Sequence, residues 1–146
     1  MIYIGADYAG YRLKESIKKH LDKSQVSYKD IGTDSDKIIN DFPEFIPPVV
    51  NKVRESKKNL GILVCGTGLG MAIGANRFKK IQATLVFSTR QAKWSRTHDN
   101  SNVLCLSSLS INKKKAGQIV DVWLSTKFQP LARRVRRFKT IDRWRT

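Results

Sequence analysis

Short apolar runs alternate with longer amphipathic stretches along this chain of 146 residues. Most of the runs are apolar at consecutive positions, which predicts strands that are buried on both faces. Strands of that kind separated by helices are typical of an open parallel sheet covered by helices on both sides. We therefore predict a single α/β domain, residues 1–146, built around a five-stranded parallel sheet. The expected strands are residues 2–6, 26–31, 60–65, 83–87 and 103–106.

The segments between these runs show helical patterns. Leu13, Ile17 and Leu21 recur at steps of four residues, with charged residues on the other face. Pro43 suits the first turn of a helix, where a missing N–H costs little. Further helices are expected at about 71–78 and 91–97, and two more after the fifth strand. The last of them, at about 127–146, is strongly basic.

Cysteine content and hydropathy restrict the class of protein. Cys65 and Cys105 are the two cysteines of the chain, too few for a structural zinc site or a disulfide framework. No apolar run approaches the ~20 residues of a membrane-spanning helix. The N-terminus shows no signal-peptide pattern, so we expect a reducing, cytoplasmic location and no membrane association.

The net charge of +16, from 28 Lys and Arg against 12 Asp and Glu, indicates attraction to anions. Three interpretations are open: solvated helix faces, a phosphorylated small-molecule substrate, or nucleic acid as a partner. The charge is densest in the C-terminal segment, with smaller clusters at Lys79-Lys80 and Lys113-Lys114-Lys115. Charge alone does not separate these interpretations, and nucleic acid is the least favoured of them.

A glycine-rich turn follows the third expected strand, at Gly66–Gly70. In parallel sheets ligands bind at the carboxyl ends of the strands, and such a turn lets backbone N–H groups converge on an anion. Its G-x-G-x-G spacing does not fit a dinucleotide fingerprint, and no acidic residue ends the next strand to hold a ribose. No lysine follows the glycines as in a P-loop. The turn therefore predicts a cradle for an anion or an oxyanion.

Two residues are candidates for proton transfer, one at this edge of the sheet and one in a loop that leads into a strand. Cys65 ends the third strand, one residue before the cradle, where amide N–H groups favour the thiolate that acts as a base or nucleophile. His98 lies in a polar loop before the fifth strand, and an imidazole commonly serves as a general acid or base. Cys105 is flanked by leucines and is expected in the core, and His20 is expected on the surface.

Several motifs together resemble ribose-5-phosphate isomerases of type B, which share one sugar-phosphate isomerase family with the galactose-6-phosphate isomerase subunits. The most specific is Cys65-Gly66-Thr67-Gly68-Leu69-Gly70, inside a longer match from Gly61 to Asn76. The other matching segments, which extend the resemblance over about residues 1–142, are Gly5-Ala6-Asp7-x-Ala9-Gly10, Asp30-x-Gly32-Thr33, Asp41-Phe42-Pro43, Ser95-Arg96-x-His98, Val120-Asp121-x-Trp123-Leu124 and Ala132-Arg133-Arg134-Val135.

The resemblance implies a Rossmann-like three-layer sandwich and an aldose–ketose isomerase that needs no metal or organic cofactor. Such an enzyme interconverts ribose 5-phosphate and ribulose 5-phosphate in the pentose phosphate pathway. Cys65 matches the base that moves a proton between C2 and C1, and His98 matches the residue that opens the furanose ring. Thr67 and the amides of the glycine turn, among them Gly66, Gly68 and Gly70, would hold the developing enediolate.

The resemblance also implies how the substrate is held. Asp7 matches an acid that binds sugar hydroxyls, and Arg134 matches a phosphate ligand. Members of the family are homodimers in which the C-terminal arginine segment reaches the neighbouring subunit's site. A second family arginine is missing, because Gln129-Pro130-Leu131 stands in its place. Arg133, Arg136 or Arg137 is the candidate replacement.

Three further positions depart from the family pattern. Tyr8 replaces a phosphate-binding histidine, and Phe42 replaces a tyrosine. Asp99-Asn100 reverses the family's Asn-Asp, which places a carboxylate beside the forming enediolate unless Asp99 turns away or holds a proton. Three hypotheses follow: a ribose-5-phosphate isomerase, an isomerase of another sugar phosphate, and a non-catalytic relative that binds anionic partners such as nucleic acid.

Overall fold

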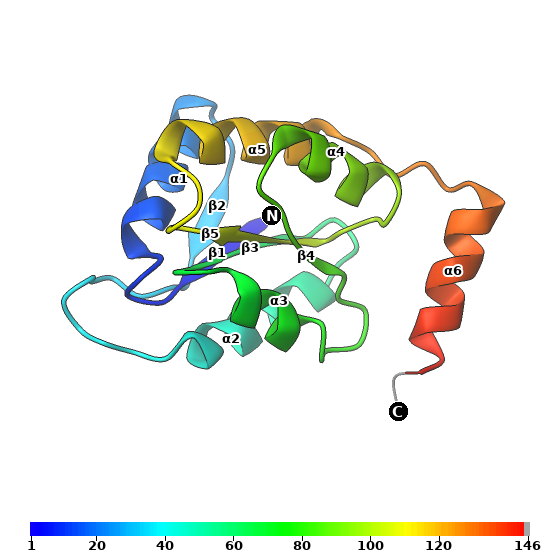
Figure 1. Cartoon of the computed structure of the whole chain (residues 1–146), viewed down its shortest axis with the longest axis horizontal. Coiled ribbons are helices and arrows are strands. Elements are labelled where there is room, and N and C mark those ends of the chain that lie inside the picture. Colours follow the sequence, from blue (N-terminus) through cyan, green and yellow to red (C-terminus); the bar gives the residue numbers. More distant parts are fainter. Residues whose placement is uncertain (145–146) are drawn as a thin grey trace.

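Five strands pair in parallel in the order β2-β1-β3-β5-β4, as the computed structural model shows for residues 1–144, the part of the chain that the structure describes (Figure 1). The two edge strands are shorter than the sequence predicts. The strands are β1 (Ile2–Ala6), β2 (Tyr28–Asp30), β3 (Leu60–Cys65), β4 (Ala83–Leu85) and β5 (Val103–Ser107). The three central strands are buried along almost their whole length, as the apolar runs predict.

Helices cover both faces of the sheet, so the predicted three-layer α/β fold is confirmed. One face packs against α1 (Tyr11–Lys23), α4 (Thr89–Thr97) and α5 (Lys113–Ser125). The other packs against α2 (Ile46–Arg54), α3 (Leu69–Ala75) and the short 3-10 helix η1 (Phe42–Phe45). Each face has its own apolar core, and Trp123 of α5 is among the largest side chains that are fully buried.

The C-terminal helix α6 (Ala132–Asp142) stands apart from the sheet at one end of the molecule (Figure 1). It begins later than predicted, since Pro130 lies in an extended segment before it. The predicted helix ran to residue 146, and residues 145–146 lie outside the described residues. Its arginine-rich faces are mostly exposed, with Arg134 as the buried exception. Within residues 1–144, no helix is both long and apolar enough to cross a membrane.

Gly10 brings the start of α1 against the end of β3. A Cβ atom at this position would overlap the Val64 carbonyl and lie 3.0 Å from the Cys65 backbone nitrogen. Backbone atoms of a central strand have little freedom to move away. The absence of a side chain at Gly10 therefore sets how closely the turn after β1 approaches Cys65.

We predict that Gly10→Ala lowers the free energy of unfolding by about 2–3 kcal/mol, the usual cost of forcing an extra carbon into packed surroundings. Gly66→Ala is the matched control, because its Cβ would lie 3.6 Å from the nearest side-chain atoms, an ordinary contact. The control should stay within about 0.5 kcal/mol of the parent protein. Urea unfolding measures both, and equal stability of the two variants would contradict the account of this contact.

Candidate active site

The carboxyl ends of β1 and β3 lie side by side, because Ala6 pairs with Val64 in the sheet register. The chain leaves β1 towards β2 at one edge and leaves β3 towards the opposite edge of the sheet. Connections that diverge in this way leave a crevice between the two strand ends, which is where ligands bind in open α/β sheets. Asp7 follows the end of β1 and Cys65 ends β3, so both stand at these strand ends.

Cys65 is positioned at the base of the glycine turn. Its side chain is buried, and its sulfur accepts a hydrogen bond from the Gly68 N–H at 3.1 Å. Gly68 has a φ of +75°, a left-handed conformation that turns its amide back towards the sulfur and that favours glycine. The Gly68 N–H therefore points at the sulfur of the side chain that the sequence analysis assigns as a candidate base.

The rest of the turn is fixed by contacts with β5 and η1. The Gly66 carbonyl accepts hydrogen bonds from the Leu109 N–H at 3.0 Å and from the Ser107 hydroxyl at 2.8 Å. The Phe42 ring lies where a side chain at Gly70 would be, so only glycine fits beneath it. Thr67 is exposed, and its hydroxyl accepts a hydrogen bond from the Leu69 N–H at 3.3 Å. The loop is therefore a preorganised set of donors open to solvent on one side.

Asp7 and Tyr8 follow the carboxyl end of β1, beside the end of β3. Asp7 is buried and accepts a hydrogen bond from the Gly10 N–H at 2.9 Å. Burial raises the pKa of Asp7, and the backbone hydrogen bonds from Gly10 and Ala9 offset only part of this. Tyr8 is 37% exposed, and its backbone N–H donates to the Asn40 side chain at 2.9 Å.

Sequence analysis did not single out Asn40. Its amide also donates to the Thr33 hydroxyl at 2.9 Å, so it ties the turn after β1 to the loop after β2. The only signal in the sequence is its place between Asp30-x-Gly32-Thr33 and Asp41-Phe42-Pro43, two motifs that the structure brings near Tyr8.

The remaining predicted site residues form a second group. His98 ends α4, and a cavity of about 210 Å³ lies between it and α6. The cavity combines one imidazole, one carboxylate and three guanidinium groups. Its lining residues are His98, Asp99, Arg133, Arg134, Arg137 and Phe138.

Arg134 is 9% exposed and is held by its neighbours. Its Nη1 donates to the Thr97 carbonyl at 3.1 Å and to the carbonyl and side-chain oxygens of Gln129 at 3.3 and 3.0 Å. These bonds occupy one nitrogen of the guanidinium. Gln129, which sequence analysis treated only as a departure from the family pattern, is therefore the residue that orients Arg134.

Asp99 faces this cationic group. Burial raises its pKa, and the positive charges of His98, Arg134 and Arg137 oppose the rise without cancelling it. Asp99 therefore holds a proton more readily than an exposed aspartate. Asn100 has a φ of +51° and lines a neighbouring cavity instead.

The two groups lie at opposite ends of the sheet. Cys65 pairs with Ser107 at the carboxyl end of β5, whereas the 98–102 loop leads into Val103 at its amino end. Five residues of strand span roughly 13 Å, so Cys65 and His98 of one chain do not meet. One chain therefore carries two half-sites: a thiol with an oxyanion cradle, and an imidazole with phosphate-binding arginines.

No three His, Cys, Asp or Glu side chains among residues 1–144 gather closely enough to hold a metal ion. The donors of both half-sites are instead amides, hydroxyls and guanidinium groups, which suit an anionic organic ligand.

The chain is similar in sequence and in structure to known ribose-5-phosphate isomerases. The chain is 40% identical over 144 residues to a probable ribose-5-phosphate isomerase B of Mycoplasma genitalium, a match covering 98% of this chain and 94% of that protein. A crystal structure of the M. genitalium ribose-5-phosphate isomerase B with bound ribulose 5-phosphate has a TM-score of 0.92 and 39% identity, over 98% of this chain and 94% of that one.

A ribose 5-phosphate isomerase structure from Thermotoga maritima has a TM-score of 0.93 and 39% identity, over 97% of each chain. The model of the Ribose/Galactose Isomerase family matches residues 2–141. Because that match spans nearly the whole chain, the protein belongs to the ribose/galactose isomerase family.

Proposed function

We propose that this protein interconverts ribose 5-phosphate and ribulose 5-phosphate as a type B isomerase. The observation that carries the proposal is the Cys65 sulfur, which accepts a hydrogen bond from the Gly68 N–H at 3.1 Å at the carboxyl end of β3. A base and an oxyanion cradle in direct contact are what proton transfer next to a carbonyl requires. The relatives named above support the choice of substrate.

The proposed reaction begins with the ring-closed sugar. His98 gives a proton to the ring oxygen, the C1 hydroxyl gives its proton to a water molecule, and the bond from C1 to the ring oxygen breaks, which opens the furanose to the aldehyde. The Cys65 thiolate then removes the C2 proton, and the charge moves onto the oxygens as an enediolate. Thr67 and the turn amides donate hydrogen bonds to that charge. Return of the proton to C1, with a proton moving from the C2 oxygen to the C1 oxygen, gives the ketose.

We propose further that the two half-sites meet in a homodimer, with Cys65 of one subunit opposite His98 of the other. The separation of these residues within one chain supports this arrangement. Apolar side chains near the glycine turn support it too, since Leu69 and Ile73 of α3 are 57% and 62% exposed. Burial of such residues between subunits is the common way to remove them from water. In this dimer Arg134 and Arg137 would bind the phosphate of the neighbouring site.

We propose that the protein acts in carbohydrate metabolism, in the pentose phosphate pathway, and in the cytoplasm. Both cysteines are free and buried, in keeping with a reducing compartment. Tyr8, Phe42 and Asp99 are the observations that favour a second candidate, isomerisation of a different sugar phosphate. Comparison of kcat/KM for five- and six-carbon aldose phosphates decides between the two, because specificity is a ratio of those values.

We predict that Cys65→Ala lowers kcat for ribose 5-phosphate by about a thousandfold or more, since loss of a positioned base removes most of the proton transfer. Cys105→Ala is the matched control, because that thiol is fully buried in the core and burial raises its pKa far above the neutral range. A coupled assay for ribulose 5-phosphate gives both rates. Full activity of Cys65→Ala would refute its role as the base, and a folded but inactive parent protein would refute the proposed reaction.

We predict that Asp99→Asn lowers KM for ribose 5-phosphate by about threefold to tenfold at pH 8, because it removes a negative charge beside the phosphate-binding arginines. The raised pKa of Asp99 sets the direction of the pH effect. As the pH falls towards that pKa the parent carboxylate takes up a proton, so the advantage of the variant should shrink. Asp142→Asn, on an exposed position of α6, makes the same charge change away from the site and should leave KM unchanged. A higher KM in Asp99→Asn would contradict the prediction.

A further inference from the structure

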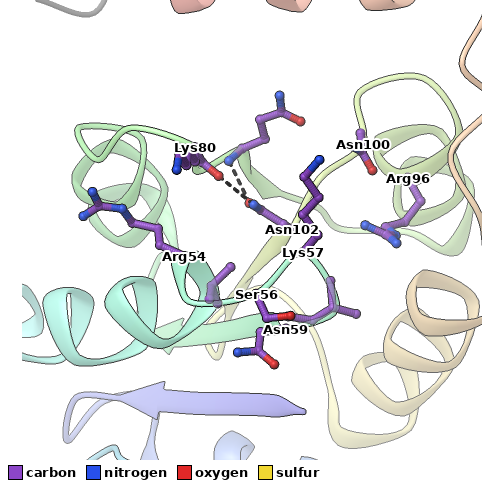
Figure 2. Close-up of a pocket in the computed structure, with 11 residues that line it drawn as sticks. Arg54, Ser56, Lys57, Asn59, Lys80, Arg96, Asn100 and Asn102 are labelled. Carbon is purple, nitrogen blue, oxygen red and sulfur yellow. Dashed lines mark hydrogen bonds between the residues drawn. The ribbon is translucent and has the colours of Figure 1, made fainter.

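A second, larger cavity lies at the amino end of the sheet, on the other side of the 98–102 loop. Its volume is about 420 Å³, within the range of small-molecule sites. It lies between the loop after α2, the loop after α3 and the residues that precede β5 (Figure 2). The lining residues are Val53, Arg54, Ser56, Lys57, Asn59, Leu60, Lys80, Gln82, Arg96, Asn100 and Asn102.

The lining is cationic and contains no carboxylate. Figure 2 shows Arg54 and Lys80 on one side, Arg96 with Asn100 on the other, and Lys57 between them. Within residues 1–144, no carboxylate lies within ion-pair distance of Arg54, Lys57 or Lys80. Like charges held together without counter-charges repel one another, and a bound anion removes that cost.

Arg96 supplies a fixed charge at one wall. Its guanidinium donates to the carbonyls of Ser101 and Thr126 and lies 5.4 Å from the centre of the Trp123 ring. Burial lowers the pKa of Arg96, and none of these neighbours is negatively charged. The side chain is therefore held in place, and an anion in the cavity would be its first negative partner.

The floor of the cavity is rigid. The Asn102 side chain accepts a hydrogen bond from the Gln82 N–H and donates one to the Lys80 carbonyl, both at 2.8 Å (Figure 2). These bonds hold Lys80 at a φ of +67°, a conformation that is uncommon for a residue with a side chain. A backbone held in this conformation fixes where the lysine side chain leaves the loop.

We propose that this cavity binds a compact anion that carries two phosphate groups, such as a sugar bisphosphate or pyrophosphate. Cations on opposite walls match two separated charged groups better than one. The apolar lining is limited to Val53 and Leu60, with no aromatic ring on which a nucleobase would stack. A small diphosphorylated molecule therefore fits the lining better than a nucleotide or a nucleic acid strand.

The cavity is distinct from both half-sites. It lies at the end of the sheet opposite Cys65, and it shares no lining residue with the cavity around His98. The 98–102 loop nevertheless contributes to both cavities, because Asn100 and Asn102 line the larger one and His98 and Asp99 line the smaller one. The proposed ligand would contact the loop that carries His98, so its binding is placed to influence that residue.

The test is a titration of the isotope-labelled full chain with inorganic pyrophosphate at ~150 mM salt, followed residue by residue in amide NMR spectra. We expect saturable shifts at residues 56–59, 80–82 and 100–102. In the double variant Lys57→Ala/Lys80→Ala the dissociation constant for pyrophosphate, obtained from these shifts, should rise by about tenfold or more, because the variant lacks two charge-assisted contacts. Lys58→Ala/Lys79→Ala is the matched control, since it removes two neighbouring lysines that do not line the cavity and should leave the affinity unchanged.

Three outcomes would overturn the proposal. Shifts confined to residues 133–138 would assign the anion to the arginine group near His98. Equal weakening in the two double variants would show a diffuse attraction to a basic surface. Tighter binding of a short RNA or DNA duplex than of pyrophosphate, lost in Lys57→Ala/Lys80→Ala, would assign the surface to nucleic acid. None of these readouts depends on isomerase activity, so they test the cavity independently of the proposed reaction.

Discussion

The pairing of β1 with β3 is the contact on which the candidate site depends. It places Asp7 beside Cys65 and aligns the two strand ends at the point where their connections diverge. Gly10 then allows α1 to begin in direct contact with the β3 backbone. On this backbone the left-handed conformation of Gly68 points its amide N–H at the Cys65 sulfur. The thiol contact thus rests on backbone geometry, which β1, β3 and the glycine turn provide together.

Electrostatics organises the molecule at both ends of the sheet. Lys14 of α1 is almost fully buried and pairs with Asp30 at the end of β2, where Lys18 also bonds the carboxylate at 2.7 Å. Burial alone would raise the pKa of Asp30, and the two lysines outweigh it, so the net effect is a lowered pKa. Glu15 also pairs with both lysines, so this cluster is balanced in charge. At the amino end of the sheet arginines and lysines gather instead, and Asp99 is the only carboxylate lining either cavity among the described residues. Cations with almost no carboxylate beside them therefore line both cavities where anionic ligands are proposed to bind.

The sequence predicted the sheet, its helices and the thiol cradle because those features follow from local patterns. Buried strands need continuous apolar runs, and Gly66–Gly70 after such a run has few structural uses. The roles of Asn40 and Gln129 were not predictable in the same way, since each acts on a residue that a different segment positions. The charge-lined cavity was missed for a similar reason: Arg54, Lys57, Lys80 and Arg96 are scattered along the chain and meet only in the fold. The edge strands β2 and β4 are shorter than predicted. An edge strand has one pairing partner, so the backbone at its ends is less constrained than in a central strand.

We propose that one catalytic site combines Cys65 of one subunit with His98 of another. The direct measurement starts from two variants that should be inactive, Cys65→Ala and His98→Ala. They are mixed, partly unfolded and refolded together, and the activity of the mixture is compared with that of each variant refolded alone. In a mixed dimer one site would carry both substitutions and the other would carry neither. Random mixing should then restore about a quarter of the parent activity, as expected for symmetric dimers. Mixed dimers that form, as mass spectrometry can verify, but show no recovery would contradict the account.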